Sequence, residues 1–151
     1  MSFRRCALAA ALGAGCSHAS PSEPSTYTVE QLTDPATCAT CHPGQYRDWS
    51  GSMHAYATDD PLFVALNDRA QASGVASFCV KCHAPMGVHE DKTDGSTATL
   101  AALEKPLRGV TCYFCHDVDA VVGSHNTALH LADDVVMRGE YNDPVANEAH
   151  R

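Results

Sequence analysis

The sequence predicts a mainly α-helical fold with extensive loops and little or no β-sheet. Its 151 residues are 44% hydrophobic and 19% charged, which is typical of one globular domain. No alternation of apolar and polar residues lasts long enough to predict a sheet, whereas start and stop signals of helices recur along the chain. Aromatic residues make up only 7% of the chain, so we expect something other than side chains to fill part of the core.

Two helices are predicted from the residues at their ends. Residues 61–73 follow a favoured N-cap residue, Asp60, with Pro61 in the first turn, and this helix should stop at Gly74. Residues 97–104 form a second and shorter helix that ends before the next proline. Both segments lie between stretches rich in Gly, Asp and Asn, which we expect to be loops.

A third helix is predicted from Pro43 onwards, because proline suits the first turn of a helix. The side chains that recur at helical spacing along this segment are His42, Tyr46, Trp49 and Met53. We interpret this stripe as the face that packs against the interior of the molecule.

The chain is acidic, and its charge excludes one large class of function. It has 18 Asp and Glu against 10 Lys and Arg, a formal net charge of -8. A nucleic-acid-binding protein would show a basic patch, so we expect no nucleic-acid partner. No stretch reaches the roughly 18 apolar residues that a membrane-spanning helix needs.

Six of the eight cysteines fall into three C-x-x-C-H motifs. The motifs are Cys38-Ala-Thr-Cys41-His42, Cys79-Val-Lys-Cys82-His83 and Cys112-Tyr-Phe-Cys115-His116. This pattern is typical of covalent attachment of c-type haem: two thiols one helical turn apart add to the two vinyl groups of the porphyrin, and the next imidazole binds the iron. We therefore predict three haem c groups, held by the six cysteines, with His42, His83 and His116 as proximal iron ligands.

Other uses of paired cysteines fit the sequence poorly. A zinc ribbon has two C-x-x-C pairs about 15–20 residues apart, but the segments between the pairs here, residues 43–78 and 84–111, are longer, and the third pair would have no partner. A disulfide framework gives no reason for a histidine after every second cysteine. A thioredoxin-like site needs a βαβ unit, which this sequence lacks.

The N-terminus has the pattern of a bacterial export signal. Arg4 and Arg5 precede a short apolar stretch, and the small residues before Cys16 resemble the lipobox of lipoproteins. We expect residues 1–15 to be a lipoprotein signal peptide and Cys16 to be the lipid attachment site, which places the protein on the periplasmic side of a membrane. Leu12 stands one residue further from Cys16 than is usual, so cleavage without lipid, giving a soluble periplasmic protein, remains the alternative. Residues 16–33 form a Ser/Pro-rich tether and residues 34–151 the haem domain.

The second ligand of each iron must come from elsewhere in the chain. The remaining histidines are His18, His54, His89, His125, His130 and His150. His54 is the best candidate, because its small neighbours allow the backbone to approach a porphyrin, and His125 and His150 come next. We interpret His89 and His130 as surface residues or contacts of haem propionates, and the methionines as core packing.

The sequence resembles multihaem cytochromes of the cytochrome c-552/4 type over about residues 34–151. Residues 38–55 are similar to the opening haem segment of such proteins, and residues 78–85 and 108–116 to the next two. The resemblance implies a helical, loop-rich fold with haems stacked in pairs, and it implies distal ligands at His54, in Ser-Met-His-Ala, and at His150, after an Asp-Pro segment. Relatives usually continue into a fourth haem motif, so a minimal three-haem form and the N-terminal part of a longer module both remain open.

These observations favour an electron-transfer protein. Three bis-histidine haems give a relay of low potential, and the acidic chain suits a redox partner with a basic docking surface. The alternative is a haem enzyme with one open iron that acts on a small nitrogen or sulfur compound. The absence of a C-x-x-C-Lys motif argues against ammonia-forming nitrite reduction. A structural lipoprotein in which haem only stabilises a small fold is a third hypothesis.

Overall fold

The computed structural model describes residues 27–139, and this part of the chain is about half helical with one small sheet. The prediction of a mainly α-helical, loop-rich fold is confirmed. No helix within the described residues is long and apolar enough to cross a membrane. The predictions for the signal peptide, Cys16, His18 and His150 lie outside the described residues.

The helices are α1 (Val29–Thr33), α2 (Pro35–Ala39), α3 (Pro43–Ser50), α4 (Pro61–Ala72), α5 (Ala76–His83), α6 (Pro85–His89), α7 (Thr97–Ala102), the 3-10 helix η1 (Lys105–Leu107) and α8 (Cys112–His116).

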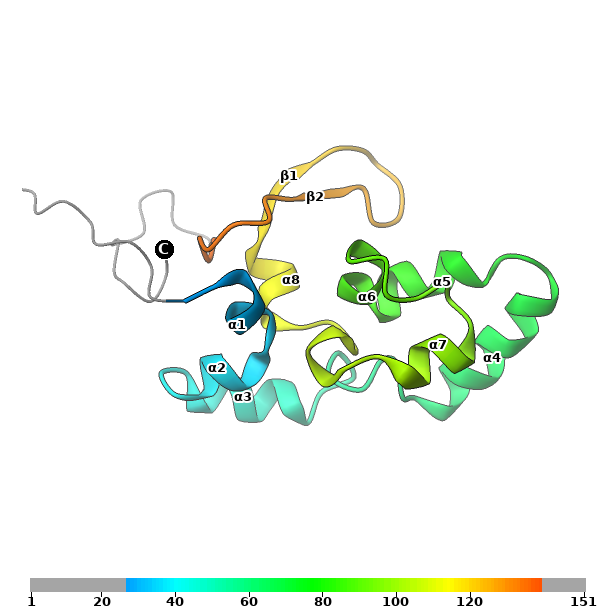
Figure 1. Cartoon of the computed structure of the whole chain (residues 1–151), viewed down its shortest axis with the longest axis horizontal. Coiled ribbons are helices and arrows are strands. Elements are labelled where there is room, and N and C mark those ends of the chain that lie inside the picture. Colours follow the sequence, from blue (N-terminus) through cyan, green and yellow to red (C-terminus); the bar gives the residue numbers. More distant parts are fainter. Residues whose placement is uncertain (1–26, 140–151) are drawn as a thin grey trace, which may run out of the picture.

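The helices form two groups that lie side by side (Figure 1). The first group contains α1, α2, α3 and α8, and it carries the first and third cysteine motifs. The second group contains α4 to α7 and η1, and it carries the second motif. The chain passes from the first group to the second through residues 51–60, which we call the connecting segment, and it returns through residues 108–111.

One apolar core joins the two groups. Its buried residues are Leu32, Phe63, Val80, Ala84, Met86, Leu100, Leu103, Leu107, Tyr113 and Leu131. Leu32 of α1 and Tyr113 of α8 come from the first group, and most of the others come from the second. Helix α3, in contrast, buries none of its residues fully. The stripe predicted to face the interior does so only in part. Tyr46 and Trp49 are half-buried, with ring centroids 5.8 Å apart, whereas His42 and Met53 are exposed, so Met53 is not core packing.

The helix predicted from Asp60 and Gly74 is present with nearly the expected bounds. The Asp60 side chain accepts hydrogen bonds from the backbone N–H groups of Leu62 and Phe63, both at 3.3 Å, and so caps α4. The helix ends at Ala72, and Gly74 follows with a φ of 71°, a left-handed conformation that favours glycine. The local signals at the two ends were therefore sufficient to place this helix.

The other two predicted helices are also present. Helix α3 begins at Pro43, as expected. Helix α7 begins at Thr97 but ends at Ala102, earlier than the predicted residue 104. It ends there because the chain turns into η1, in which Pro106 lies.

A short antiparallel hairpin follows the third motif. Strand β1 (Val118–Val121) pairs with β2 (Leu129–Leu131), with an irregularity between Val118 and Ala120. This sheet is small enough to agree with the prediction of little β-structure. Its strands of four and three residues are too short to produce a readable alternation in the sequence.

The folded part of the chain begins before residue 34, the boundary expected from the sequence. Thr28 caps α1 by a reciprocal arrangement, in which its hydroxyl accepts from the N–H of Gln31 and the Gln31 side chain accepts from the N–H of Thr28. Leu32 of this helix is buried in the core. Residues 28–33 therefore belong to the domain and not to the tether.

Candidate cofactor-binding site

Each C-x-x-C-H motif lies on a short helix or directly after one. The first begins in α2 and continues as a turn, in which the N–H of His42 donates to the carbonyl of Cys38 at 2.8 Å. The second motif closes α5, and the third spans the whole of α8. Helical geometry thus places the two thiols of each motif about one turn apart, as attachment to one porphyrin edge requires.

The thiols are accessible at the surface of the described part. The first cysteine of each motif is partly exposed and the second is exposed, at Cys41, Cys82 and Cys115. None of the six is joined in a disulfide. The helices therefore offer both thiols of each pair to a group bound from outside the helix.

The His83 ring is held in a fixed orientation. Its Nδ1 lies 2.9 Å from the backbone carbonyl oxygen of Ala57. Because a carbonyl can only accept, Nδ1 must carry the proton, and the lone pair of Nε2 stays available for a metal. The ring also stacks on Phe63, with centroids 3.9 Å apart and planes 7° from parallel. This is the arrangement expected of an oriented iron ligand.

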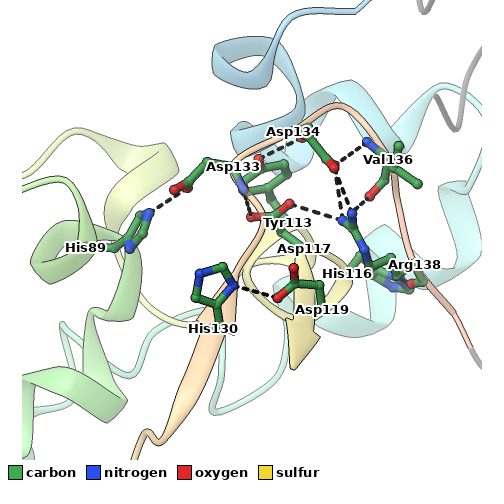
Figure 2. A network of polar contacts seen from close by, with 10 residues as sticks. All are labelled: His89, Tyr113, His116, Asp117, Asp119, His130, Asp133, Asp134, Val136 and Arg138. Atoms are coloured by element: carbon green, nitrogen blue, oxygen red, sulfur yellow. Dashed lines mark hydrogen bonds and ion pairs between the residues drawn. The ribbon is translucent and has the colours of Figure 1, made fainter. Parts of the chain in front are cut away.

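The His116 ring is held in the same way by a segment far along the chain (Figure 2). Its Nδ1 donates to the backbone carbonyl of Arg138, and the N–H of Arg138 donates to the carbonyl of His116 at 2.7 Å. The Arg138 side chain binds Asp134 at 2.7 Å and reaches the fully buried Asp117 at 3.4 Å. The hydrogen bond from Arg138 lowers the pKa of the Asp134 carboxyl, so this pair is charged at neutral pH.

The first and third motifs meet at their first cysteines. The thiols of Cys38 and Cys112 lie close enough to shift each other's pKa, and helix α2 contacts α8. The Cys38 thiol lowers the pKa of Cys112 to about 6, with a further contribution from nearby His116. The same contact, together with burial, raises the pKa of Cys38, and burial raises the pKa of Cys115. The two attachment sites are therefore neighbours, although 73 residues of chain (39–111) separate them.

The connecting segment ties the second motif to the residues that lead into the third. The Thr58 hydroxyl donates to the carbonyl of His83 at 2.9 Å and accepts from the N–H of Gly109 at 2.7 Å. The N–H of Val110 donates to the carbonyl of His54 at 2.8 Å. Trp49, at the end of α3, donates from its indole N–H to the carbonyl of Val110 at 2.8 Å. These bonds fix the three motifs relative to one another.

Gly109 allows the chain before the third motif to approach the backbone of the connecting segment closely. Its φ is 66°, and a Cβ at this position would lie 2.4 Å from the carbonyl oxygen of His54 and 2.6 Å from that of Ala55. Both atoms belong to the backbone and cannot swing away as a flexible side chain would. The third motif thus depends on a glycine three residues before its first cysteine.

Several apolar side chains near the second motif stay exposed to solvent, and a large apolar group could cover them. Phe78, directly before Cys79, is 59% exposed, and Leu62, Leu66 and Val75 are exposed on the same helix pair. Thr111, directly before Cys112, has a buried hydroxyl with no hydrogen-bond partner. Accessible thiol pairs, imidazoles held at Nδ1 and uncovered apolar side chains together fit covalently bound haem.

The proposed distal ligands are only partly placed by the structure. His54 is exposed in the connecting segment, where its backbone carbonyl binds Val110. His125 is exposed in the loop between the strands, with its Nδ1 3.4 Å from the carbonyl of Asn126. His89 and His130 each bind an aspartate at the surface. The sequence did not indicate which aspartates these two histidines would contact. His150 lies outside the described residues.

The comparison with known protein families decides the class of the chain. The family model described as cytochrome c554 and c-prime matches residues 37–117. The chain belongs to this family. The matched residues contain all three C-x-x-C-H motifs and the connecting segment. No curated protein and no solved structure matches the chain.

Membership identifies this protein as a c-type cytochrome, which binds haem covalently and serves electron transfer. The family resemblance inferred from the motifs is thereby confirmed. The residues that orient His83 and His116 in this cytochrome, however, escaped the sequence analysis, because they act through backbone carbonyls. A carbonyl is present at every position, so no residue type could have marked these two.

Proposed function

We propose that this cytochrome carries three covalently bound haems and relays electrons between redox partners on the periplasmic side of a membrane. Support comes from three complete motifs, each with both thiols accessible. The six cysteines would hold the porphyrins, and His42, His83 and His116 would bind the irons. A c-type haem supplies an iron that alternates between the ferric and ferrous states.

The observation that carries the proposal is the proximity of the first and third attachment sites, which lie on the contacting helices α2 and α8. Attachment sites on two contacting helices keep their redox centres close, and electron transfer between centres needs short distances. The bond from Thr58 to His83 and the one it receives from Gly109 hold the second motif in the same rigid frame. A protein in which haem only stabilised the fold would have no need to bring the attachment sites together.

For the distal positions we propose histidines, with His54, His125 and His150 as the candidates, giving bis-histidine ligation and low potentials. The protein contributes to this chemistry by orienting the imidazole rings of two proximal ligands. The carbonyls of Ala57 and Arg138 fix the protons of His83 and His116 on Nδ1. A ring fixed in this way changes little between oxidation states, which keeps the cost of reorganisation small.

The net charge of -8 suits redox partners that present a basic docking surface. Attraction between unlike charges would speed the encounter, and added salt would screen it, with a Debye length of about 10 Å at 0.1 M. The same negative charge would repel nucleic acid, so we do not expect nucleic acid to be a partner.

Spectroelectrochemical titration of the purified holoprotein distinguishes an electron carrier from an enzyme. We expect every haem to be reduced and reoxidised reversibly, with little carbon monoxide binding, because all six-coordinate irons are closed to small ligands. Stoichiometric binding of carbon monoxide to one haem of the wild-type protein would contradict the carrier and favour the alternative, an enzyme with one open iron. Haems that could not be reduced and reoxidised would indicate that haem only stabilises the fold.

We also propose that Cys16 carries lipid and becomes the first residue of the mature chain. The Cys16→Ser variant should then move from the membrane fraction to the soluble periplasmic fraction, because the protein loses its anchor while its haem domain is unchanged. Fractionation followed by haem staining measures this. A wild-type protein that is already soluble, with its N-terminus elsewhere, would contradict lipid attachment and leave simple secretion.

A further inference from the structure

We propose that His130 is an axial ligand of one of the haems and that Asp119 holds its ring in the ligating form. This inference rests on the proposed function, since it needs bound haem. It differs from the interpretation of His130 as a surface residue or propionate contact. Because three irons have only three distal positions, His130 takes the place of one of the candidates His54, His125 and His150. It also places a ligand on the β-hairpin, which the sequence did not predict as an element.

The first support is the cavity beside which His130 lies. This cavity, of about 380 Å³, is open to solvent and is lined by residues of the hairpin, of the second helix group and of α8. Lys81 and Phe114 both line it, and each stands between the two cysteines of its motif. A cavity bordered by two attachment segments is where an iron ligand from the hairpin is needed.

The second support is the hydrogen bond that holds the ring (Figure 2). Nδ1 of His130 lies 2.7 Å from Oδ1 of Asp119. An ionised carboxylate can only accept, so Nδ1 carries the proton and Nε2 keeps its lone pair. A carboxylate on the second nitrogen of a ligating histidine fixes the ring and makes it more basic. The His130 side chain is 61% exposed, so protein does not cover this ring.

The third support is the irregularity in the hairpin. His130 pairs with Ala120, whereas the next residue, Leu131, pairs with Val118, so Asp119 is the extra residue of a bulge. In a regular ladder, Asp119 and Ala120 would point to opposite faces of the sheet. Asp119 would then face away from His130. The bulge turns Asp119 towards the ring, and such re-aiming of one side chain is a recurrent use of bulges near functional sites.

His89 lines the same cavity and provides the contrast. Its Nε2, and not its Nδ1, binds Asp133, at 2.6 Å. That leaves only Nδ1, which lies closer to the backbone and is harder to bring to an iron. Asp133 is itself anchored, because its backbone N–H donates to Asp117 at 2.9 Å. Among the described residues, no three His, Cys, Asp or Glu side chains cluster as a metal site, so the two histidines do not form one together.

The test compares three variants of the holoprotein by pyridine haemochrome, which counts haems, and by electron paramagnetic resonance, which reports their spin states. For His130→Gly we expect an unchanged haem count and conversion of one haem from low-spin to high-spin. Added imidazole should restore the low-spin signal by replacing the lost ring. His89→Gly is the matched control and should leave every haem low-spin. Asp119→Asn should keep all haems low-spin and raise the midpoint potential of one, since the neutral partner makes the ligand less basic.

Low-spin spectra from every haem of His130→Gly, at an unchanged haem count, would overturn the proposal. So would a high-spin signal that imidazole leaves unaltered, or a spin change in His89→Gly. If His130→Gly does not accumulate, unchanged potentials of all haems in Asp119→Asn would overturn it. A wild-type haem count below three tests the proposed function and not His130, so the two failures are distinguishable.

Discussion

The Gly109→Ala variant is expected to lose most of its folded, haem-loaded protein. A left-handed conformation costs a non-glycine residue about 1–2 kcal/mol. The added Cβ would also lie 2.4 Å and 2.6 Å from two backbone oxygens, so the connecting segment must move away. That movement strains the bonds from Val110 to His54 and from Gly109 to Thr58, each of which contributes about 1 kcal/mol. The total, about 3 kcal/mol, is a large part of the stability of a small domain.

Gly44→Ala provides the control for this prediction. Gly44 lies in α3, and a Cβ there would meet nothing within 4 Å. Gly44 is the second residue of this helix, and alanine is favoured over glycine in helices by up to about 1 kcal/mol, so this variant should be at least as stable as the wild type. Yield of haem-loaded protein and denaturant midpoint measure both changes. Equal midpoints for Gly109→Ala and the wild type would contradict the close approach seen at Gly109.

The second large effect is expected at His54, the first choice for a distal ligand. His54→Ala should convert one low-spin haem to high-spin, create new carbon monoxide binding and raise the potential of that haem. The protein should stay folded, because His54 contributes its backbone carbonyl, not its ring, to the bond with Val110. The thioether bonds would still hold the porphyrin. Electron paramagnetic resonance and gas titration measure the change.

Met53→Ala is the matched control, since Met53 is the exposed neighbour of His54 in the connecting segment. Its sulfur accepts a hydrogen bond from the Tyr56 hydroxyl, and we expect no haem to change spin state when it is removed. If every haem of His54→Ala remains low-spin and no new gas binding appears, His54 is not a ligand. A change in Met53→Ala alone would assign the ligand to the thioether.

The parts of this structure that the sequence predicted are those with local causes. Asp60, Pro61 and Gly74 set the ends of α4 through bonds and angles within a few residues. The C-x-x-C-H motifs are local in the same sense, because one helical turn fixes the relation of their side chains. The hairpin was not predicted, since strands of three and four residues carry too little pattern.

The parts that could not be predicted depend on contacts between distant segments. Nothing in the spacing of Cys38 and Cys112 indicates that the helices carrying them, α2 and α8, contact each other. The carbonyl of Arg138 that holds His116 is reached only after the chain has formed the hairpin and returned to α8. The role of Thr58 could not be predicted either, because a threonine in a loop has many ordinary uses. Only the folded backbone identifies these residues as the ones that fix the motifs.

The central claim is that all three motifs carry haem, and the intact mass of the mature holoprotein tests it most directly. We expect three haem additions per chain, and the double variant Cys79→Ala with Cys82→Ala should lose one and keep two, because the first and third motifs meet in the other helix group. Pyridine haemochrome at known protein concentration provides an independent count. A mature wild-type protein with fewer than three additions would contradict the account.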